Sequence, residues 1–140
     1  MTRRRGEEGA VSLFVIVVTV ALIAAIGLVV DGGGKIRALE RADEAAREAA
    51  RAGSQMLDVP AAVRGERVGV DPGAAARAAR AYLEAAGVEG AVSVSGAVVT
   101  VSTRVVYRPV FFGFVGIGPI AVTGEASARP VMAGDVEEVP

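Results

Sequence analysis

The sequence predicts an α+β protein: a single N-terminal transmembrane helix continued by an Ala-rich helix, then a second, short helix and a three-stranded antiparallel sheet. Three observations predict this class. Residues 10–30 carry no charge, and two later segments place apolar residues at the three- and four-residue spacing of a helix. The last third of the chain instead alternates apolar and polar residues with the period of two that strands have.

Composition argues against several functional classes. Hydrophobic residues make up 52% of the 140 residues, and the mean hydropathy of +0.47 is high for a soluble protein. The net charge is −1, so the chain lacks the basic surface that nucleic acid requires, and we expect no nucleic-acid partner. Cys and His are absent, which removes disulfides, the usual zinc ligands and the common nucleophile–base pairs. We therefore expect no cofactor, no metal, no small-molecule substrate and no enzymatic activity.

The first element is the predicted transmembrane helix, residues 10–30, preceded by a basic N-terminus at residues 1–9. At 1.5 Å per residue it is about 30 Å long, which matches the hydrocarbon core of a bilayer. Its polar side chains are Ser12 and Thr19, whose hydroxyls can bond back to helix carbonyls. A cleaved signal would have a shorter apolar run ending in small residues, whereas this run continues past Ala24 and Ala25. We expect a retained membrane span.

A second helical segment is expected from Lys35 to about Leu57, after a break at the three glycines of residues 32–34. Each glycine costs a helix about 1 kcal/mol relative to alanine, so three should loosen or end it. Small and apolar residues then recur on one face and form a helix-packing stripe, with charged residues opposite. The stripe packs either on the protein's own sheet or on other copies of the chain. Its members are Leu39, Ala42, Ala46, Ala49, Gly53 and Met56.

The next helix follows a linker that runs from Val59 to Val70. Asp71 is placed as its N-cap and Pro72 at its first helical position, and Gly87 follows its last residue, Ala86. Its expected apolar side consists of Ala75, Ala79, Tyr82, Leu83 and Ala86.

The three strands are expected at residues 91–95, 99–108 and 120–129. In the second strand Val99, Val101 and Val105 alternate with polar residues, and the third strand repeats this pattern. Such alternation is typical of an antiparallel sheet with one covered face and one solvated face, and the Ala-rich helices are the expected cover. The head is thus expected to span residues 31–130. Residues 131–140 are acidic without a period, which predicts a flexible tail.

An apolar loop, Pro109 to Pro119, joins the second and third strands. It holds three of the four Phe residues of the chain, Phe111, Phe112 and Phe114. Connections are normally polar, so a loop of this composition either tucks onto the core or contacts a membrane or a partner. We refer to the three Phe residues as the apolar contact loop, and both interpretations stay open here.

Two stretches resemble the TadE/TadG-like proteins, components of the bacterial Flp (tight-adherence) pilus assembly machinery, in their short actinobacterial form. The first is the run from Arg5 to Leu13 that leads into the span, together with its exit at residues 28–33 and the Ala-rich helix that follows. The second is the pattern of two strands around the apolar loop. The resemblance implies a pilin-like fold and a minor pilin-like or pseudopilin-like subunit in the cytoplasmic membrane, with its N-terminus inside and its head outside.

The resemblance also implies a place to look for leader processing, at Gly6 or Gly9. TadE-type pseudopilins have a Glu at the fifth position after the processed Gly, as type IV prepilins do, whereas Val11 and Phe14 stand at these positions here. Ser12 occupies the place of a hydroxyl residue in the TadG-like branch, which implies an uncleaved membrane anchor.

The expected partners are the lipid bilayer and either other Tad/Flp pilus assembly proteins or copies of this chain. Within the predicted span, Ala21 and Ala25 form a small-xxx-small pair that would allow another helix to approach closely in the membrane. The charge distribution alone does not set the orientation: Arg residues precede the span, and further basic residues follow it. The alternative function is a single-pass, membrane-tethered binding module for envelope partners, without a role in pilus assembly.

Overall fold

The computed structural model describes residues 4–65 and 69–130, without the side chains of residues 4–8 and 62. The elements in chain order are α1 (Arg4–Ser54), α2 (Val59–Val63), α3 (Pro72–Ala86), β1 (Glu89–Ser95), β2 (Val98–Tyr107), the 3₁₀ helix η1 (Phe112–Val115) and β3 (Ile120–Ala128). The predicted α+β class is confirmed: a long apolar N-terminal helix leads into a shorter helix and a three-stranded antiparallel sheet. Residues 1–3 of the predicted basic N-terminus and the predicted tail, residues 131–140, lie outside the described residues.

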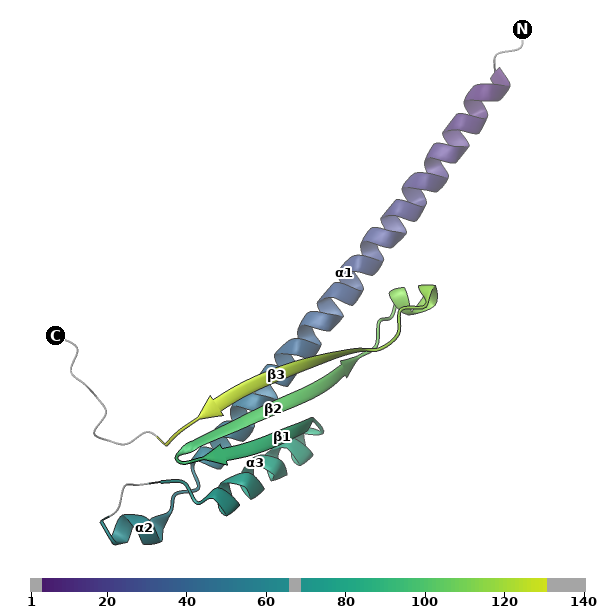
Figure 1. The fold of residues 1–140 in the computed structure, drawn as a ribbon. Coiled ribbons are helices and arrows are strands. Elements are labelled where there is room, and N and C mark those ends of the chain that lie inside the picture. The colour runs from purple at the N-terminus through teal and green to yellow at the C-terminus, as the bar shows by residue number, and fades with distance from the viewer. Residues whose placement is uncertain (1–3, 66–68, 131–140) are drawn as a thin grey trace, which may run out of the picture.

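Helix α1 is a single helix of 51 residues, about 75 Å long at 1.5 Å per residue. By length and composition it is able to cross a membrane, and its apolar first half stands clear of the head in Figure 1. In that half the Thr19 hydroxyl donates to the carbonyl of Val15 at 2.8 Å, as expected for a hydroxyl in a nonpolar helix.

The predicted break at residues 32–34 is wrong, because α1 runs through all three glycines. Their helix propensity costs about 1 kcal/mol each, but that cost is local. On the N-terminal side Asp31 binds the loop after β2, and on the C-terminal side α1 packs on the sheet from Ala42 onward. The helix is thus held on both sides of the glycines, and tertiary packing outweighs their propensity.

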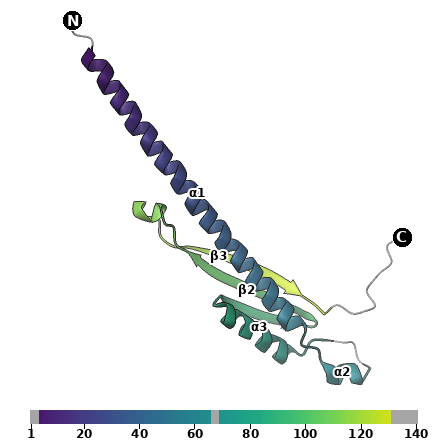
Figure 2. The ribbon, with the colours of Figure 1, turned by 180° about the vertical axis from the view of Figure 1, so that it is seen from behind.

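The head consists of two layers. Strand order in the sheet is β1–β2–β3, with both pairs antiparallel, and α1 packs on β2 and β3 while α3 packs mainly on β1. The sheet lies in front of both helices in Figure 1, and the view from behind in Figure 2 shows α1 and α3 side by side on the covered face. In β2 the expected alternation is present: Val99, Val101 and Thr103 are buried, whereas Ser102 and Arg104 are exposed.

The core between the layers is built mostly from alanine and valine. Its members are Ala45, Ala46, Ala49, Ala50, Val70, Ala75, Ala79, Leu83, Val88, Val99 and Val101. Small side chains let the two layers approach closely: a Cβ on Gly53 would lie 2.9 Å from Val99 Cγ1 and 3.1 Å from the carbonyl oxygen of Ala75. A Cβ on Gly124 would lie 2.6 Å from the carbonyl oxygen of Ala42. Close packing of this kind makes the core sensitive to added volume.

The helix-packing stripe lies against the protein's own sheet and α3 for most of its length. Ala42, Ala46 and Ala49 are fully buried there, and Gly53 is buried beside α3. The two ends of the stripe differ: Leu39 is largely exposed, and Met56 follows the end of α1 and is half-buried against the core. These four buried positions are therefore occupied by intramolecular contacts.

The segment between α1 and α3 contains a short helix where the sequence predicts only a linker. Asp58 accepts a hydrogen bond from the backbone N–H of Ala61 at 3.0 Å, which caps α2. The ends of α3 are as predicted: Asp71 accepts from the N–H of Ala74 at 2.9 Å, and Gly87 takes the left-handed conformation that ends the helix.

Candidate functional site

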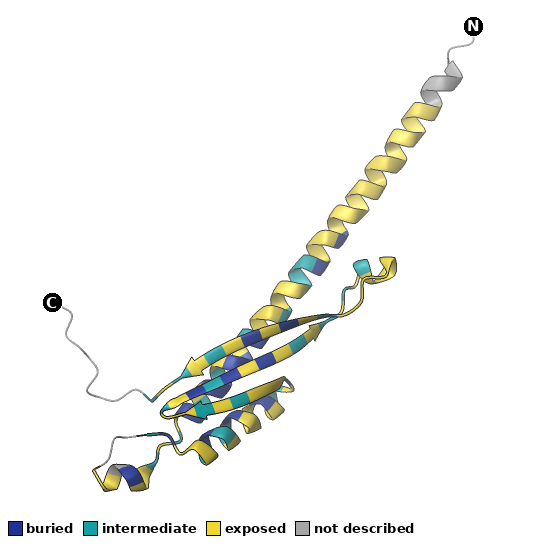
Figure 3. Ribbon diagram, viewed as in Figure 1, coloured by how far each residue is buried: buried dark blue, intermediate teal, exposed yellow. Residues whose placement is uncertain are grey.

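The best-defined polar site is the carboxylate of Asp31, directly after the predicted span. Asp31 is only 5% exposed. In the part of α1 that precedes it, residues 9–30, every residue except Gly27 is exposed (Figure 3). The oxygen Oδ1 accepts from the Tyr107 hydroxyl at 3.0 Å and from the backbone N–H groups of Val110 at 2.8 Å and Phe111 at 3.2 Å. The other oxygen, Oδ2, accepts from the N–H of Phe112 at 2.7 Å. One carboxylate thus binds four donors, one from the last residue of β2 and three from the β2–β3 connection.

The local sequence brings these donors together. Tyr107 is the last residue of β2 and lies on the same face as Val99, Val101 and Thr103, so the alternation of the strand directs its ring toward α1. Pro109 has no N–H and fixes its own φ, and the backbone turns after it. The next three N–H groups therefore leave the sheet ladder and converge on the carboxylate.

Two glycines of α1 make room for this contact. Gly27, Asp31 and Gly34 are spaced four and three residues apart and so share one helix face. A Cβ on Gly27 would lie 2.8 Å from the Phe111 ring, and a Cβ on Gly34 would collide with the ring and hydroxyl of Tyr107. We call Gly27, Asp31 and Gly34 together with Tyr107 and residues 110–112 the Asp31 joint.

The joint favours the ionised carboxylate. Desolvation by burial is the largest single influence and would raise the pKa of Asp31, but the backbone N–H groups of Phe112, Val110 and Phe111 and the Tyr107 hydroxyl lower it. Together these donors outweigh burial, so the pKa of Asp31 lies below its ordinary value of 3.8. Burial raises the pKa of Tyr107, and its hydrogen bond to Asp31 and the negative charge there raise it further. Asp31 is therefore the acceptor and Tyr107 the neutral donor at neutral pH.

This arrangement is suited to holding the chain in place. The four donors take up both carboxylate oxygens, and all four come from the protein itself. Within residues 4–65 and 69–130, no group of three or more acidic, His or Cys side chains could hold a metal ion. The site fixes the β2–β3 connection against the helix at the point where the predicted span ends.

The structure divides the apolar contact loop into a packed part and an exposed part. Phe111 lies against Gly27, and both Phe111 and Phe112 are half-buried. Phe114, in η1, is 89% exposed, and its neighbour Val115 is 74% exposed. The two interpretations of this loop thus apply to different residues: the start of the loop is tucked onto α1, and η1 presents apolar side chains outward.

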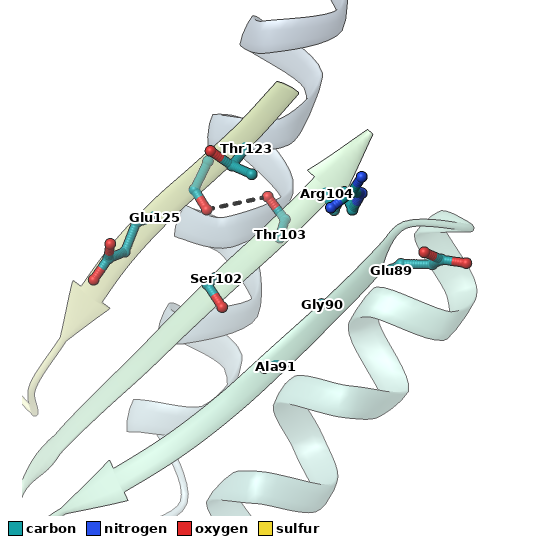
Figure 4. A pocket seen from close by; sticks show the side chains of 9 residues that line it. Glu89, Gly90, Ala91, Ser102, Thr103, Arg104, Thr123 and Glu125 are labelled. Carbon is teal, nitrogen blue, oxygen red and sulfur yellow. Dashed lines mark hydrogen bonds between the residues drawn. The ribbon is translucent and has the colours of Figure 1, made fainter. Parts of the chain in front are cut away.

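A second candidate lies on the outer face of the sheet, where a shallow depression crosses the three strands (Figure 4). Gly90 and Ala91 form its floor on β1, and the charged side chains of Glu89, Arg104 and Glu125 stand around it. Thr103 also lines this region but turns its hydroxyl inward, donating to the carbonyl of Ala42 at 2.7 Å. The depression is open and results from small residues on a solvated face.

Sequence reasoning did not single out Asp31. A signal was available: a carboxylate stands directly after the uncharged residues 9–30, where burial without partners would be costly. Its donors, however, lie 76 to 81 residues away, and three of them are backbone groups that no residue type reveals. The possible processing positions, Gly6 and Gly9, both lie within α1.

None of the protein-family models, curated proteins or solved structures that were searched matches this chain.

Proposed function

We propose that this protein is a membrane-anchored, pilin-like or pseudopilin-like subunit with a structural role in assembling a Flp/Tad pilus or a related secretion apparatus. In this proposal residues 10–30 cross the cytoplasmic membrane with the N-terminus inside and the head outside, and the chain catalyses no reaction. The observation that carries the proposal is the division of α1. One continuous helix is bare and apolar over its first half and covered by the sheet over its second half (Figure 3).

Such a helix supports assembly through its first half. The small residues of the second half are already used by the head, since Ala42, Ala46 and Ala49 are fully buried. Ala21 and Ala25 are exposed and stand four residues apart, so a second helix can approach closely on that face within the membrane. We therefore propose residues 10–30, and not the helix-packing stripe, as the assembly surface.

Disulfide cross-linking in native membranes tests the assembly role, because the chain has no cysteine of its own. We expect Ala21→Cys or Ala25→Cys to give cross-linked oligomers or links to partner proteins under mild oxidation. Ile23→Cys is the matched control, since it lies two residues on and faces away from that side of the helix. Absence of cross-links from every position in residues 10–30, with the protein still in the membrane, contradicts assembly through the span.

The alternative, a membrane-tethered binding module without pilus assembly, is favoured by the exposed apolar side chains of η1. In that case partner capture depends on Phe114 and not on the span. A chimaera in which an unrelated transmembrane helix replaces residues 10–26 separates the two functions, because it keeps Gly27 and the whole head. If the chimaera still binds its partner, the result supports the membrane-tethered binding module. If it no longer forms oligomers and pilus assembly is lost, the result supports the pilus subunit.

Two further measurements test topology and processing. A membrane-impermeant thiol reagent applied to intact cells should label Ser102→Cys, on the exposed face of β2, but not Thr2→Cys. The reverse pattern contradicts the orientation. Mass spectrometry of the mature N-terminus distinguishes an anchor, which keeps Met1 or Thr2, from a processed pseudopilin, which begins at Glu7 or Ala10.

A further inference from the structure

The β2–β3 connection reaches past the end of the sheet and along α1 toward its bare half. Figures 1 and 2 both show η1 beyond the strands and beside α1. The contact of Phe111 with Gly27 sets the level of the connection along the helix. Gly27 lies three residues before Val30, the last residue of the predicted span, which corresponds to about 4.5 Å on the hydrocarbon side of its end. The loop therefore overlaps the span instead of stopping above it.

The side chains of this connection are apolar, and several of them are exposed. Residues 109–119 contain no charged or hydroxyl side chain. Phe114 is 89% exposed and Val115 is 74% exposed, and Val110 and Ile117 are exposed over about half of their surface or more. Exposed apolar groups of this size in water would be unfavourable. Here they continue the apolar surface of residues 10–30, which is itself exposed over its whole length except at Gly27.

The backbone of the loop is suited to a lipid environment. Irregular backbone is tolerated at membrane depth only where its polar groups find partners within the protein. The N–H groups of Val110, Phe111 and Phe112 bind Asp31, and those of Phe114, Gly116 and Ile117 bind carbonyls within the loop at 3.0 to 3.2 Å. Pro109 and Pro119, at its two ends, have no N–H to satisfy.

Basic side chains lie on the aqueous side of the position along α1 at which Phe111 contacts Gly27. Lys35 and Arg37 on α1 and Arg108 before the loop are exposed. Lys35 is five residues beyond Val30, or about 7.5 Å along the helix, which is within the headgroup layer of a bilayer. Long basic side chains at such a position extend toward lipid phosphates.

From these observations we propose that residues 110–118 are a membrane-inserted loop: η1 lies in the outer interface of the phospholipid bilayer beside α1, and Asp31 holds the loop there by accepting from the N–H groups of Val110, Phe111 and Phe112. Phe114 and Val115 enter the boundary between headgroups and acyl chains. The head then contacts the membrane at two places, the span and the loop. This inference rests on the membrane anchor in the proposed function.

Depth-dependent fluorescence quenching tests the inference on the full chain in phosphatidylethanolamine–phosphatidylglycerol vesicles. Bimane is attached to Phe114→Cys, to Val20→Cys in the span, or to Ser102→Cys on the sheet, and bromine-labelled lipid is the quencher. All three positions are exposed within the protein, so the label need not disturb the fold. We expect a blue shift and loss of fluorescence at positions 114 and 20, with lipid brominated nearer the headgroup quenching position 114 more strongly, and no change at position 102.

Each other outcome overturns a defined part of the inference. Water-like emission without quenching at position 114 excludes insertion, and a blue shift there without lipid quenching shows cover by protein, such as a second copy. If lipid does not quench the label at position 20, the proposed membrane anchor is wrong. If only the label at position 114 is not quenched, the loop insertion is wrong and the proposed anchor is unaffected. Asp31→Asn should release the loop and reduce quenching at position 114, while Glu44→Gln on the same helix should not. Unchanged quenching in Asp31→Asn overturns the role given to Asp31.

Discussion

Asp31 is a single side chain that organises the end of the head nearest the predicted span. Its two oxygens accept from one hydroxyl and three backbone N–H groups, and charge-assisted bonds of this type are stronger than neutral ones. If the carboxylate is removed, the three N–H groups lose their acceptor in a partly buried setting, which is more costly than the mean value of a hydrogen bond suggests.

Asp31→Asn tests this role. An amide presents one acceptor oxygen and two donors, so it cannot accept all four bonds. We expect hydrogen exchange at Val110, Phe111 and Phe112 to accelerate on the order of tenfold, while exchange in the core strands is unchanged. Tyr107→Phe removes one donor of the four and should give a smaller effect. Glu44→Gln, an exposed carboxylate on the same helix, is the control, and equal exchange in all variants would contradict the joint.

The pH dependence of the joint follows from the lowered pKa of Asp31. Because the folded pKa lies below 3.8, the stabilisation is present above pH 3.8 and is lost as the pH falls through the folded value. We expect the amide resonances of residues 110–112 to titrate with a midpoint below pH 3.8, and this transition to be missing in Asp31→Asn. A midpoint above 3.8 would mean that burial outweighs the hydrogen bonds.

Helix α1 uses its glycines in two different ways. A Cβ at Gly32 would meet no atom within 4 Å, whereas a Cβ at Gly34 would collide with Tyr107. The three consecutive glycines thus include one that the fold does not need and one that the Asp31 joint requires. A sequence pattern cannot separate them, because both lie within the same helix.

Gly32→Ala and Gly34→Ala should therefore have opposite effects. At Gly32 alanine relieves the cost of a glycine within a helix and should raise the free energy of unfolding by about 0.5–1 kcal/mol. At Gly34 the added methyl group displaces Tyr107, and overpacking should lower the free energy of unfolding by about 1–3 kcal/mol. Denaturation of both variants in the same mild detergent provides the measurement. Effects of the same sign would contradict the close approach of Tyr107.

The two halves of α1 should differ in thiol reactivity as well. Cysteines at Ala42 and Ala49 replace fully buried side chains and should react with a thiol reagent only after denaturation, provided that the small added volume is tolerated. A cysteine at Glu40, on the exposed face, should react at once. Rapid labelling at position 42 or 49 in the folded protein would show that the stripe is open to other copies.

At the scale of the whole molecule, α1 is a single straight helix shared by the predicted span and the head. The head is attached to it at the Asp31 joint and again where Thr103 donates to the carbonyl of Ala42 and Gly124 lies against the same residue. Two attachments at different heights along one helix prevent the sheet from pivoting about either. The direction of α1 therefore sets the orientation of the head.

A distance measurement tests the straightness of α1. Spin labels at Leu13 and Glu48, both with side chains that are not fully buried, are 35 positions apart, or about 52 Å in a straight helix. We expect a narrow distribution near this value by pulsed electron paramagnetic resonance in nanodiscs. The double variant Gly32→Ala, Gly33→Ala should leave it unchanged. A broad distance distribution, or one centred at a clearly shorter distance, in the protein that keeps all three glycines would show that α1 breaks or bends at residues 32–34.

The amino-acid sequence by itself determined the elements that depend on local periodicity. The caps Asp71 and Gly87 and the alternation in β2 and β3 each predicted the observed element to within a few residues. The uncharged run of residues 10–30 predicted a helix there, but not its continuation to Ser54. These signals are strong because helix and strand periods act over neighbouring residues, and one face of each element must be buried.

Tertiary structure alone decided what depends on contacts between distant residues. The continuity of α1 through residues 32–34, the use of Ala42 and Ala49 inside the head, and the division of the apolar loop all arise from packing against β2, β3 and η1. The Asp31 joint is the clearest case, since backbone N–H groups supply three of its four donors. Every residue except proline carries such a group, so only the folded chain shows which of them meet the carboxylate.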